Sequence, residues 1–181
     1  VITNLKPRAP SEPGDVVLVT HGSLFKLETF LTQMEHWNGP ASFAVYMNSL
    51  GESKPDALDM LEKFLKENQE QLEKASIHLY MEYTKTTKTP PSYPHNPLRN
   101  VAMDESNADF IVALDVDFIP LPKNCHEKLH QVLHERNSSL AMEMRARKRI
   151  MVLPAFEVYA RNGTKVATQD QLPSSKKELY E

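Results

Sequence analysis

Short apolar runs that alternate with stretches of helical periodicity constrain the fold of this chain more than any other feature. The apolar runs lie at 15–20, 42–47, 76–83, 109–114 and 150–156. Between them, apolar residues recur at helical spacing over about 24–37, 55–74, 96–103 and 123–136. Strands that alternate with helices of this length indicate βαβ units. We therefore predict an α/β domain with a mostly parallel sheet and flanking helices, in which ligands bind at the carboxyl ends of the strands.

The first residues differ in character from the rest of the chain. Three prolines and a glycine stand among polar residues between 7 and 14, so we predict a linker over 1–14 and a domain over 15–181. No run approaches the roughly 20 apolar residues that cross a bilayer, so we expect membrane attachment only through an anchor outside this chain. A net charge of -3 offers no basic surface to nucleic acid, and we expect no such partner.

Two aspartates, Asp115 and Asp117, directly follow the apolar run at 109–114. Carboxylates are costly among buried groups unless something pairs with them. Residues i and i+2 of a strand point the same way, so both carboxylates can converge where the chain leaves the strand. Two hard oxygen ligands at this edge suit Mg²⁺ or Mn²⁺, and a diphosphate is the natural occupant of the remaining metal positions. The pair is therefore a candidate metal–diphosphate site.

Two other interpretations of the pair stay open on the residues alone. An aspartate at a strand end often has a capping or turn role. Phosphohydrolases of the haloacid dehalogenase type also carry D-x-D after a strand, and Asp115 would then be the nucleophile. That class has a small or hydroxyl residue after the second aspartate, in a Gly-rich turn. The bulky, stiff Phe118-Ile-Pro120 departs from this pattern and favours a nucleotide-sugar enzyme.

The residues around the pair form three blocks whose order and spacing carry a family resemblance. The blocks are Asn96-Pro-Leu-Arg-Asn-Val-Ala-Met103, Ala113-Leu-Asp-Val-Asp-Phe-Ile-Pro120 and Met151-Val-Leu-Pro-Ala-Phe-Glu157. They resemble glycosyltransferase family 49, the glycosyl-transferase for dystroglycan group of LARGE-like and β-1,4-glucuronyltransferase-like enzymes. The similarity spans about residues 15–181. It implies a GT-A fold, a Rossmann-like α/β sandwich that uses a divalent metal and a UDP-sugar donor.

The resemblance also assigns roles around the two aspartates. Asp117 would bind Mn²⁺ or Mg²⁺ directly, and Asp115 would contact the donor and the metal. Arg99 lies off the apolar face of its helix, so it would be free to reach the donor's phosphate or sugar, with Asn100 beside it. A surface ion pair is the alternative for Arg99, because that is the commonest role of an arginine on a helix.

Further residues lie at the ends of other apolar runs. Thr20 and His21, at the end of the first, would line the nucleotide pocket, although loop residues would look the same. Glu157, at the end of the last, would contact acceptor or donor. Asn137 and Asn162 fit the N-glycosylation pattern in polar stretches. They favour a secretory lumen, and the resemblance implies the Golgi lumen, with the full-length form a type II membrane protein.

The resemblance implies a function as well. Well-known family members transfer glucuronic acid from UDP-glucuronate with inversion, which requires a carboxylate general base. We therefore expect a metal-dependent transferase that moves a sugar, glucuronic acid in the first instance, from a UDP-sugar donor to a saccharide acceptor in protein glycosylation. Family domains continue beyond the last block, so we expect a truncated domain whose general base and third metal ligand lie beyond Glu181. A non-catalytic carbohydrate-binding relative with the same fold is the remaining alternative.

Overall fold

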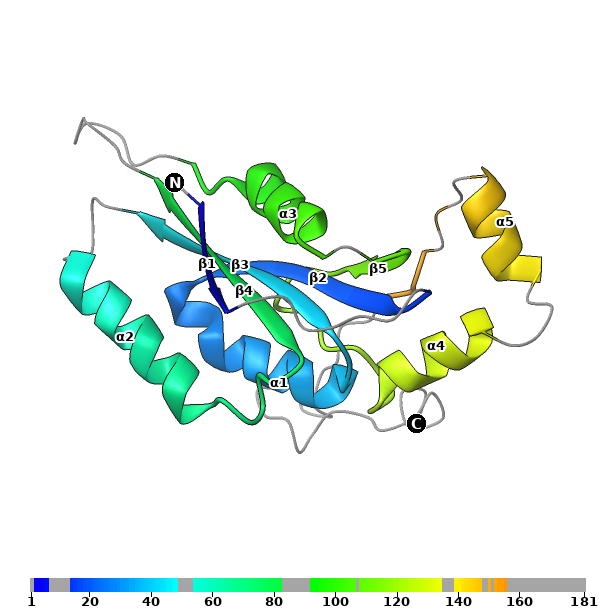
Figure 1. Cartoon of the computed structure of the whole chain (residues 1–181), viewed down its shortest axis with the longest axis horizontal. Coiled ribbons are helices and arrows are strands. Elements are labelled where there is room, and N and C mark those ends of the chain that lie inside the picture. Colours follow the sequence, from blue (N-terminus) through cyan, green and yellow to red (C-terminus); the bar gives the residue numbers. More distant parts are fainter. Residues whose placement is uncertain are drawn as a thin grey trace, which may run out of the picture.

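The computed structural model describes residues 2–6, 14–48, 54–82, 92–106, 108–134, 139–147, 150 and 152–155. In these residues strands and helices alternate along most of the chain, as Figure 1 shows. In chain order the elements are β1 Ile2–Lys6, β2 Val16–Ser23, the 3₁₀ helix η1 Leu24–Lys26, α1 Leu27–Trp37, β3 Ala41–Asn48, α2 Lys54–Glu67, β4 Ala75–Glu82, α3 His95–Asp104, β5 Phe110–Ala113, α4 Cys125–His134 and α5 Ser139–Arg147. No helix in the described ranges is both long and apolar enough to cross a bilayer.

The strands of the described part form one sheet in the order β1-β4-β3-β2-β5. β4, β3, β2 and β5 run parallel to one another, and β1 pairs with the outer edge of β4 in the antiparallel sense. The register places Leu18 of β2 opposite Ala41 of β3 on one side and Val112 of β5 on the other. The predicted α/β fold with a mostly parallel sheet is confirmed.

Helices cover both faces of this sheet: in Figure 1, α3 lies above it and α1 and α2 lie below it. On that side Val17 and Val19 of β2 pack with Leu98 of α3. Val16 and Leu18 point the other way, into the larger core shared with α1, α2 and α4. Strands buried on both faces read as continuous apolar runs, which explains the pattern in the sequence.

The predicted linker is wrong for residues 2–6, which form β1. Its register joins Ile2 to Tyr80 and Lys6 to Ile77 of β4. The prolines and glycine that indicated a linker begin at residue 7, whereas Ile2–Lys6 precedes them. The unpaired backbone groups along the outer edge of β4 form the hydrogen bonds that make Ile2–Lys6 a strand. The local sequence of residues 2–6 does not show that this edge is available.

We predicted a strand over residues 150–156, and the described residues of this range do not form one. Residues 150 and 152–155 have no regular secondary structure. Ile150 is 90% exposed and Val152 is 84% exposed, so their side chains are not inside a sheet. Apolar, β-branched residues favour a strand only where a neighbouring strand pairs with them, and an apolar run does not establish that neighbour.

Candidate functional site at the carboxyl edge of the sheet

The two aspartates lie in a tight turn, residues 115–118, that follows β5; we call it the aspartate turn. Phe118 N donates to Asp115 O at 3.0 Å and closes it. Val116, between the two aspartates, is buried in the larger core, and both carboxylates remain partly exposed. A buried apolar residue flanked by exposed acids therefore fixes which way the turn faces.

Gln33 of α1 holds the backbone of this turn. Its side chain is completely buried, and Nε2 donates to Asp115 O at 3.2 Å and to Phe118 O at 2.8 Å. Each carbonyl thereby gains a partner, which a buried polar group requires. The turn is thus held by a helix that packs on the face opposite α3.

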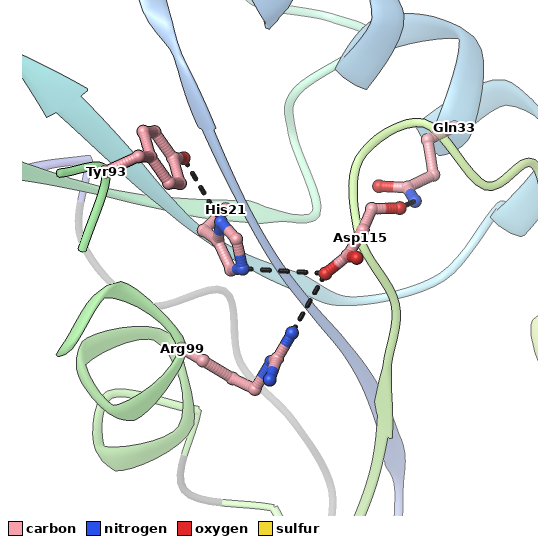
Figure 2. A network of polar contacts seen from close by, with 5 residues as sticks. All are labelled: His21, Gln33, Tyr93, Arg99 and Asp115. Carbon is pink, nitrogen blue, oxygen red and sulfur yellow. Dashed lines mark hydrogen bonds and ion pairs between the residues drawn. The ribbon is translucent and has the colours of Figure 1, made fainter. Parts of the chain in front are cut away.

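Asp115 joins three elements, as Figure 2 shows. Arg99 of α3 places Nη2 at 2.9 Å from Asp115 Oδ1, and Nε2 of His21 in β2 lies 3.6 Å from the same oxygen. The Asp115 side chain is 48% exposed and that of Arg99 36%, so water screens this pair and leaves both groups accessible to a ligand.

His21 is neutral at physiological pH. Burial lowers its pKa below the ordinary value of 6.5, and the nearby Asp115 carboxylate only partly opposes this. The 3.6 Å contact with Asp115 is therefore not an attraction between two full charges. On its other side His21 Nδ1 lies 3.1 Å from the Tyr93 hydroxyl.

Tyr93 reports on the electrostatics of the whole site. Burial first, and then the negative charges of Asp115 and Asp117, raise its pKa to about 12. The phenol therefore keeps its proton, which it can donate to His21 Nδ1. Both carboxylates of the aspartate turn therefore contribute to the negative charge around this hydroxyl.

Aromatic rings extend from Tyr93 along this edge. His95, at the start of α3, has its ring centroid 4.6 Å from that of Tyr93, and Tyr46 of β3 lies 5.2 Å away on another side. His21 completes the group at 5.5 Å from His95. The rings are tilted or edge-on, which is a favourable geometry for aromatic pairs. They form an aromatic cluster at this edge of the sheet.

Asp117 is paired with a different cation. Lys26, the last residue of η1, places Nζ at 2.7 Å from Asp117 Oδ1. The Asp117 side chain is 62% exposed and that of Lys26 42%. This pair is thus formed at the surface, directly after the carboxyl end of β2.

The structure brings together some of the residues predicted for the site and separates others. Asp115, Arg99 and His21 are in contact, and Asp117 lies in the same turn as Asp115. Thr20 is completely buried, and strand alternation turns it to the face opposite His21, so it does not reach this group. Asn100 is exposed on α3 and takes part in none of the contacts above, whereas Asn137, Glu157 and Asn162 lie outside the described residues.

The sequence did not point to Gln33 or Lys26, and it left Tyr93 and His95 undecided. Gln33 gave a signal, because it is the polar residue on the apolar face of α1, at helical spacing from Phe30 and Trp37. A polar side chain inside such a face predicts a buried hydrogen-bonding partner. Lys26 gave no signal, since a lysine beside a helix start is usually solvated.

The chemistry of the aspartate turn fits a hard divalent cation as a partial ligand set. It offers two partly exposed carboxylates in one turn at the carboxyl edge of the sheet, and oxygen is the ligand that Mg²⁺ and Mn²⁺ prefer. In the described residues no group of three His, Cys, Asp or Glu side chains gathers to complete such a site. A metal held here would therefore take its other ligands from water, from substrate phosphates or from residues not described.

The parallel strands with helices on both faces form a Rossmann-like α/β fold of the kind that glycosyltransferases have. The model of one family, described as "glycosyl-transferase for dystroglycan", matches residues 15–92 and 83–181. The chain belongs to this family, as the three sequence blocks predicted.

Relatives from several vertebrates share this similarity. The chain is 30% identical over 148 residues to "Xylosyl- and glucuronyltransferase LARGE2" of Rattus norvegicus, covering 82% of this chain and 19% of that protein. It is 33% identical over 145 residues to "Xylosyl- and glucuronyltransferase LARGE2s" of Gallus gallus, covering 80% and 17%. For "Xylosyl- and glucuronyltransferase LARGE1" of Homo sapiens the identity is 28% over 147 residues, covering 81% and 17%. The chain thus spans less than a fifth of the length of these relatives.

Proposed function

We propose that the protein containing this chain is a metal-dependent glycosyltransferase of protein glycosylation. It transfers glucuronic acid from a UDP-sugar to a saccharide acceptor, and this chain supplies the donor- and metal-binding part. The observation that carries the proposal is the aspartate turn at the carboxyl edge of a parallel sheet, with Arg99 facing Asp115 at 2.9 Å. Family membership and relatives named as xylosyl- and glucuronyltransferases support it.

Different residues of the site bind the metal ion and the donor. Asp117 and Asp115 are the protein ligands for Mn²⁺ or Mg²⁺. A cation bound there supplies neutralisation of the negative charge that develops on the leaving diphosphate. Arg99 reaches a phosphate or sugar oxygen of the donor, because its partly exposed guanidinium retains donors that Asp115 does not use.

His21 and Tyr93 belong to the nucleotide side of this site. His21 is neutral, so it can donate a hydrogen bond toward the edge without adding charge. In the aromatic cluster, the rings of Tyr93 and His95 offer faces on which a base can stack. A combination of aromatic rings and a few directed polar groups is usual for a nucleotide-binding site.

We also place the whole protein in the Golgi lumen, held by a membrane anchor outside this chain. The proposal rests on the family and on the two glycosylation sequons at Asn137 and Asn162. Glycosidase treatment of the secreted-pathway protein tests it: a loss of apparent mass that both Asn→Gln changes abolish is expected. A protein that stays unglycosylated when expressed with its own leader contradicts this location.

Titration of UDP into the whole protein, with and without Mn²⁺, tests the function. UDP binding should require Mn²⁺ and should be lost in Asp117→Asn, because the amide removes a charged metal ligand. Asp104→Asn, an exposed aspartate on α3, is the matched control and should bind like the wild type.

The same preparations separate the alternatives. Failure of UDP to bind in the presence of Mn²⁺ contradicts the transferase. Phosphate release from a phosphomonoester that depends on Asp115 would instead establish the phosphohydrolase. A protein that shows neither activity but binds saccharide would be a non-catalytic relative.

A further inference from the structure

Each carboxylate of the aspartate turn has its own cation in this structure. Arg99 Nη2 lies 2.9 Å from Asp115 Oδ1, and Lys26 Nζ lies 2.7 Å from Asp117 Oδ1. The four charges therefore cancel before any ligand binds. A metal ion that reaches Asp117 has to compete with the Lys26 ammonium for the same carboxylate.

The main chain directs Lys26 toward this position. Lys26 is the last residue of the short helix η1, and it lies over Gly22 of β2. A Cβ added to Gly22 would lie 3.0 Å from Lys26 Cβ and 3.3 Å from the Phe43 ring. The missing side chain at Gly22 lets the lysine stem pack on the end of the strand. With 42% of its side chain exposed, Lys26 can leave Asp117 without burying an unpaired charge.

The two cations are not equivalent in their freedom to move. The planar Arg99 guanidinium is anchored by α3, whose Leu98 is completely buried against the sheet. Lys26 carries a compact charge on a flexible stem and faces the more exposed of the two aspartates. Lys26 is thus the cation that an incoming metal ion displaces, whereas Arg99 stays.

We propose that Lys26 occupies the metal position at Asp117 until a nucleotide diphosphate arrives, and that it then pairs with a phosphate oxygen of that diphosphate. This role rests on the proposed function. Charge balance is the physical reason. A divalent cation alone adds two positive charges and the diphosphate of a UDP-sugar alone adds two negative charges, whereas the two together restore neutrality. Lys26 thereby makes the affinity for the metal depend on the nucleotide.

The test measures Mn²⁺ affinity of the whole protein by electron paramagnetic resonance of free Mn²⁺, with and without UDP. Lys26→Met should tighten nucleotide-free Mn²⁺ binding by roughly fivefold, the order of effect of one partly exposed charge. It should weaken UDP binding at saturating Mn²⁺ by a similar factor, since a phosphate loses its cation. The ratio of the Mn²⁺ affinities with and without UDP therefore shrinks in the variant.

Two controls isolate the position of the charge. Lys123→Met removes a lysine from another exposed ion pair, Lys123 Nζ to Glu35 Oε1 at 2.6 Å, and should change neither affinity. Lys26→Arg keeps the charge and should keep nucleotide-free Mn²⁺ binding close to that of the wild type. Unchanged Mn²⁺ affinity in Lys26→Met overturns this inference while the proposed function stands. A wild type that binds neither Mn²⁺ nor UDP removes the proposed function itself, and this inference with it.

Discussion

Replacement of Arg99 by methionine separates a structural role of the Arg99–Asp115 contact from a functional one. Methionine keeps much of the apolar stem of arginine and removes the guanidinium. We expect a small loss of stability and a large loss of nucleotide affinity, because the contact is too exposed to stabilise the fold much. A residue that matters only to folding would show the opposite balance.

The magnitudes follow from the geometry of the pair. Two unit charges at 2.9 Å attract by about 1.4 kcal/mol in the dielectric of water, before side-chain entropy and salt reduce the gain. With the two side chains 36% and 48% exposed, we expect Arg99→Met to lower the free energy of unfolding by about 0.5–1 kcal/mol. A hydrogen bond to a charged phosphate contributes about 1.5–3 kcal/mol, so UDP affinity should fall roughly tenfold to a hundredfold.

Arg145→Met is the matched control for this experiment. Arg145 Nη2 lies 3.0 Å from Asp109 Oδ2, and both side chains are 51% exposed, so the pair repeats the geometry away from the aspartate turn. Its guanidinium also lies over the Phe110 ring, so the control should cost slightly more stability. Urea unfolding and calorimetric UDP titration with Mn²⁺ provide the two readouts. UDP affinity within twofold of the wild type in Arg99→Met would refute a contact between Arg99 and the donor's phosphates.

Three further predictions concern the core beneath the site. Leu98→Ala should lower the free energy of unfolding by about 3 kcal/mol, because Leu98 is completely buried. Val132→Ala should change the free energy of unfolding by no more than about 0.5 kcal/mol, because Val132 is 46% exposed. Equal losses for the two variants in urea unfolding would contradict this. Burial lowers the pKa of His36 below 6.5, so the unfolded chain takes up a proton at a higher pH than the folded protein does, and the free energy of unfolding decreases as the pH drops below 6.5. His36→Gln should make this decrease shallower between about pH 7.5 and pH 5.5. An unchanged dependence of the free energy of unfolding on pH would exclude His36 as its source. Burial also raises the pKa of the single cysteine, Cys125, so its reaction with a thiol reagent at about pH 8 should be at least tenfold slower in the folded than in the urea-unfolded protein, and equal rates would show an accessible thiol.

The sequence predicted the layered fold because each element carries its own signal. The apolar runs at 15–20 and 42–47 correspond to strands β2 and β3, and both are buried on two faces as their composition requires. The contact between Arg99 and Asp115 was not predicted: from the sequence we expected Arg99 to reach the donor, with a surface ion pair as the alternative, and the structure shows a partly exposed ion pair. Local sequence patterns were sufficient to predict strands and helices where burial determines which residue types occur.

The remaining features depend on partners that are distant in sequence. β1 exists because the edge of β4 is free to pair, and the pairing joins residues more than 70 positions apart. Lys26 and Asp117 meet across 91 positions, and Gln33 reaches Phe118 across 85. Such contacts follow from the arrangement of whole elements. Exposed lysines and aspartates satisfy themselves in water at almost any position, so their composition alone does not predict which pairs form.

The two aspartates are therefore supported differently, although the sequence presents them as equivalent. Asp115 has its backbone carbonyl held by Gln33 and its carboxylate by Arg99, so its position is fixed before a ligand binds. Asp117 has one movable lysine and greater exposure. A site that keeps one carboxylate rigid and the other exchangeable retains its geometry for the donor and lets a metal ion replace Lys26 at Asp117. Under the proposed function, this division makes Asp115 the orienting residue and Asp117 the one at which metal and nucleotide affinities are coupled.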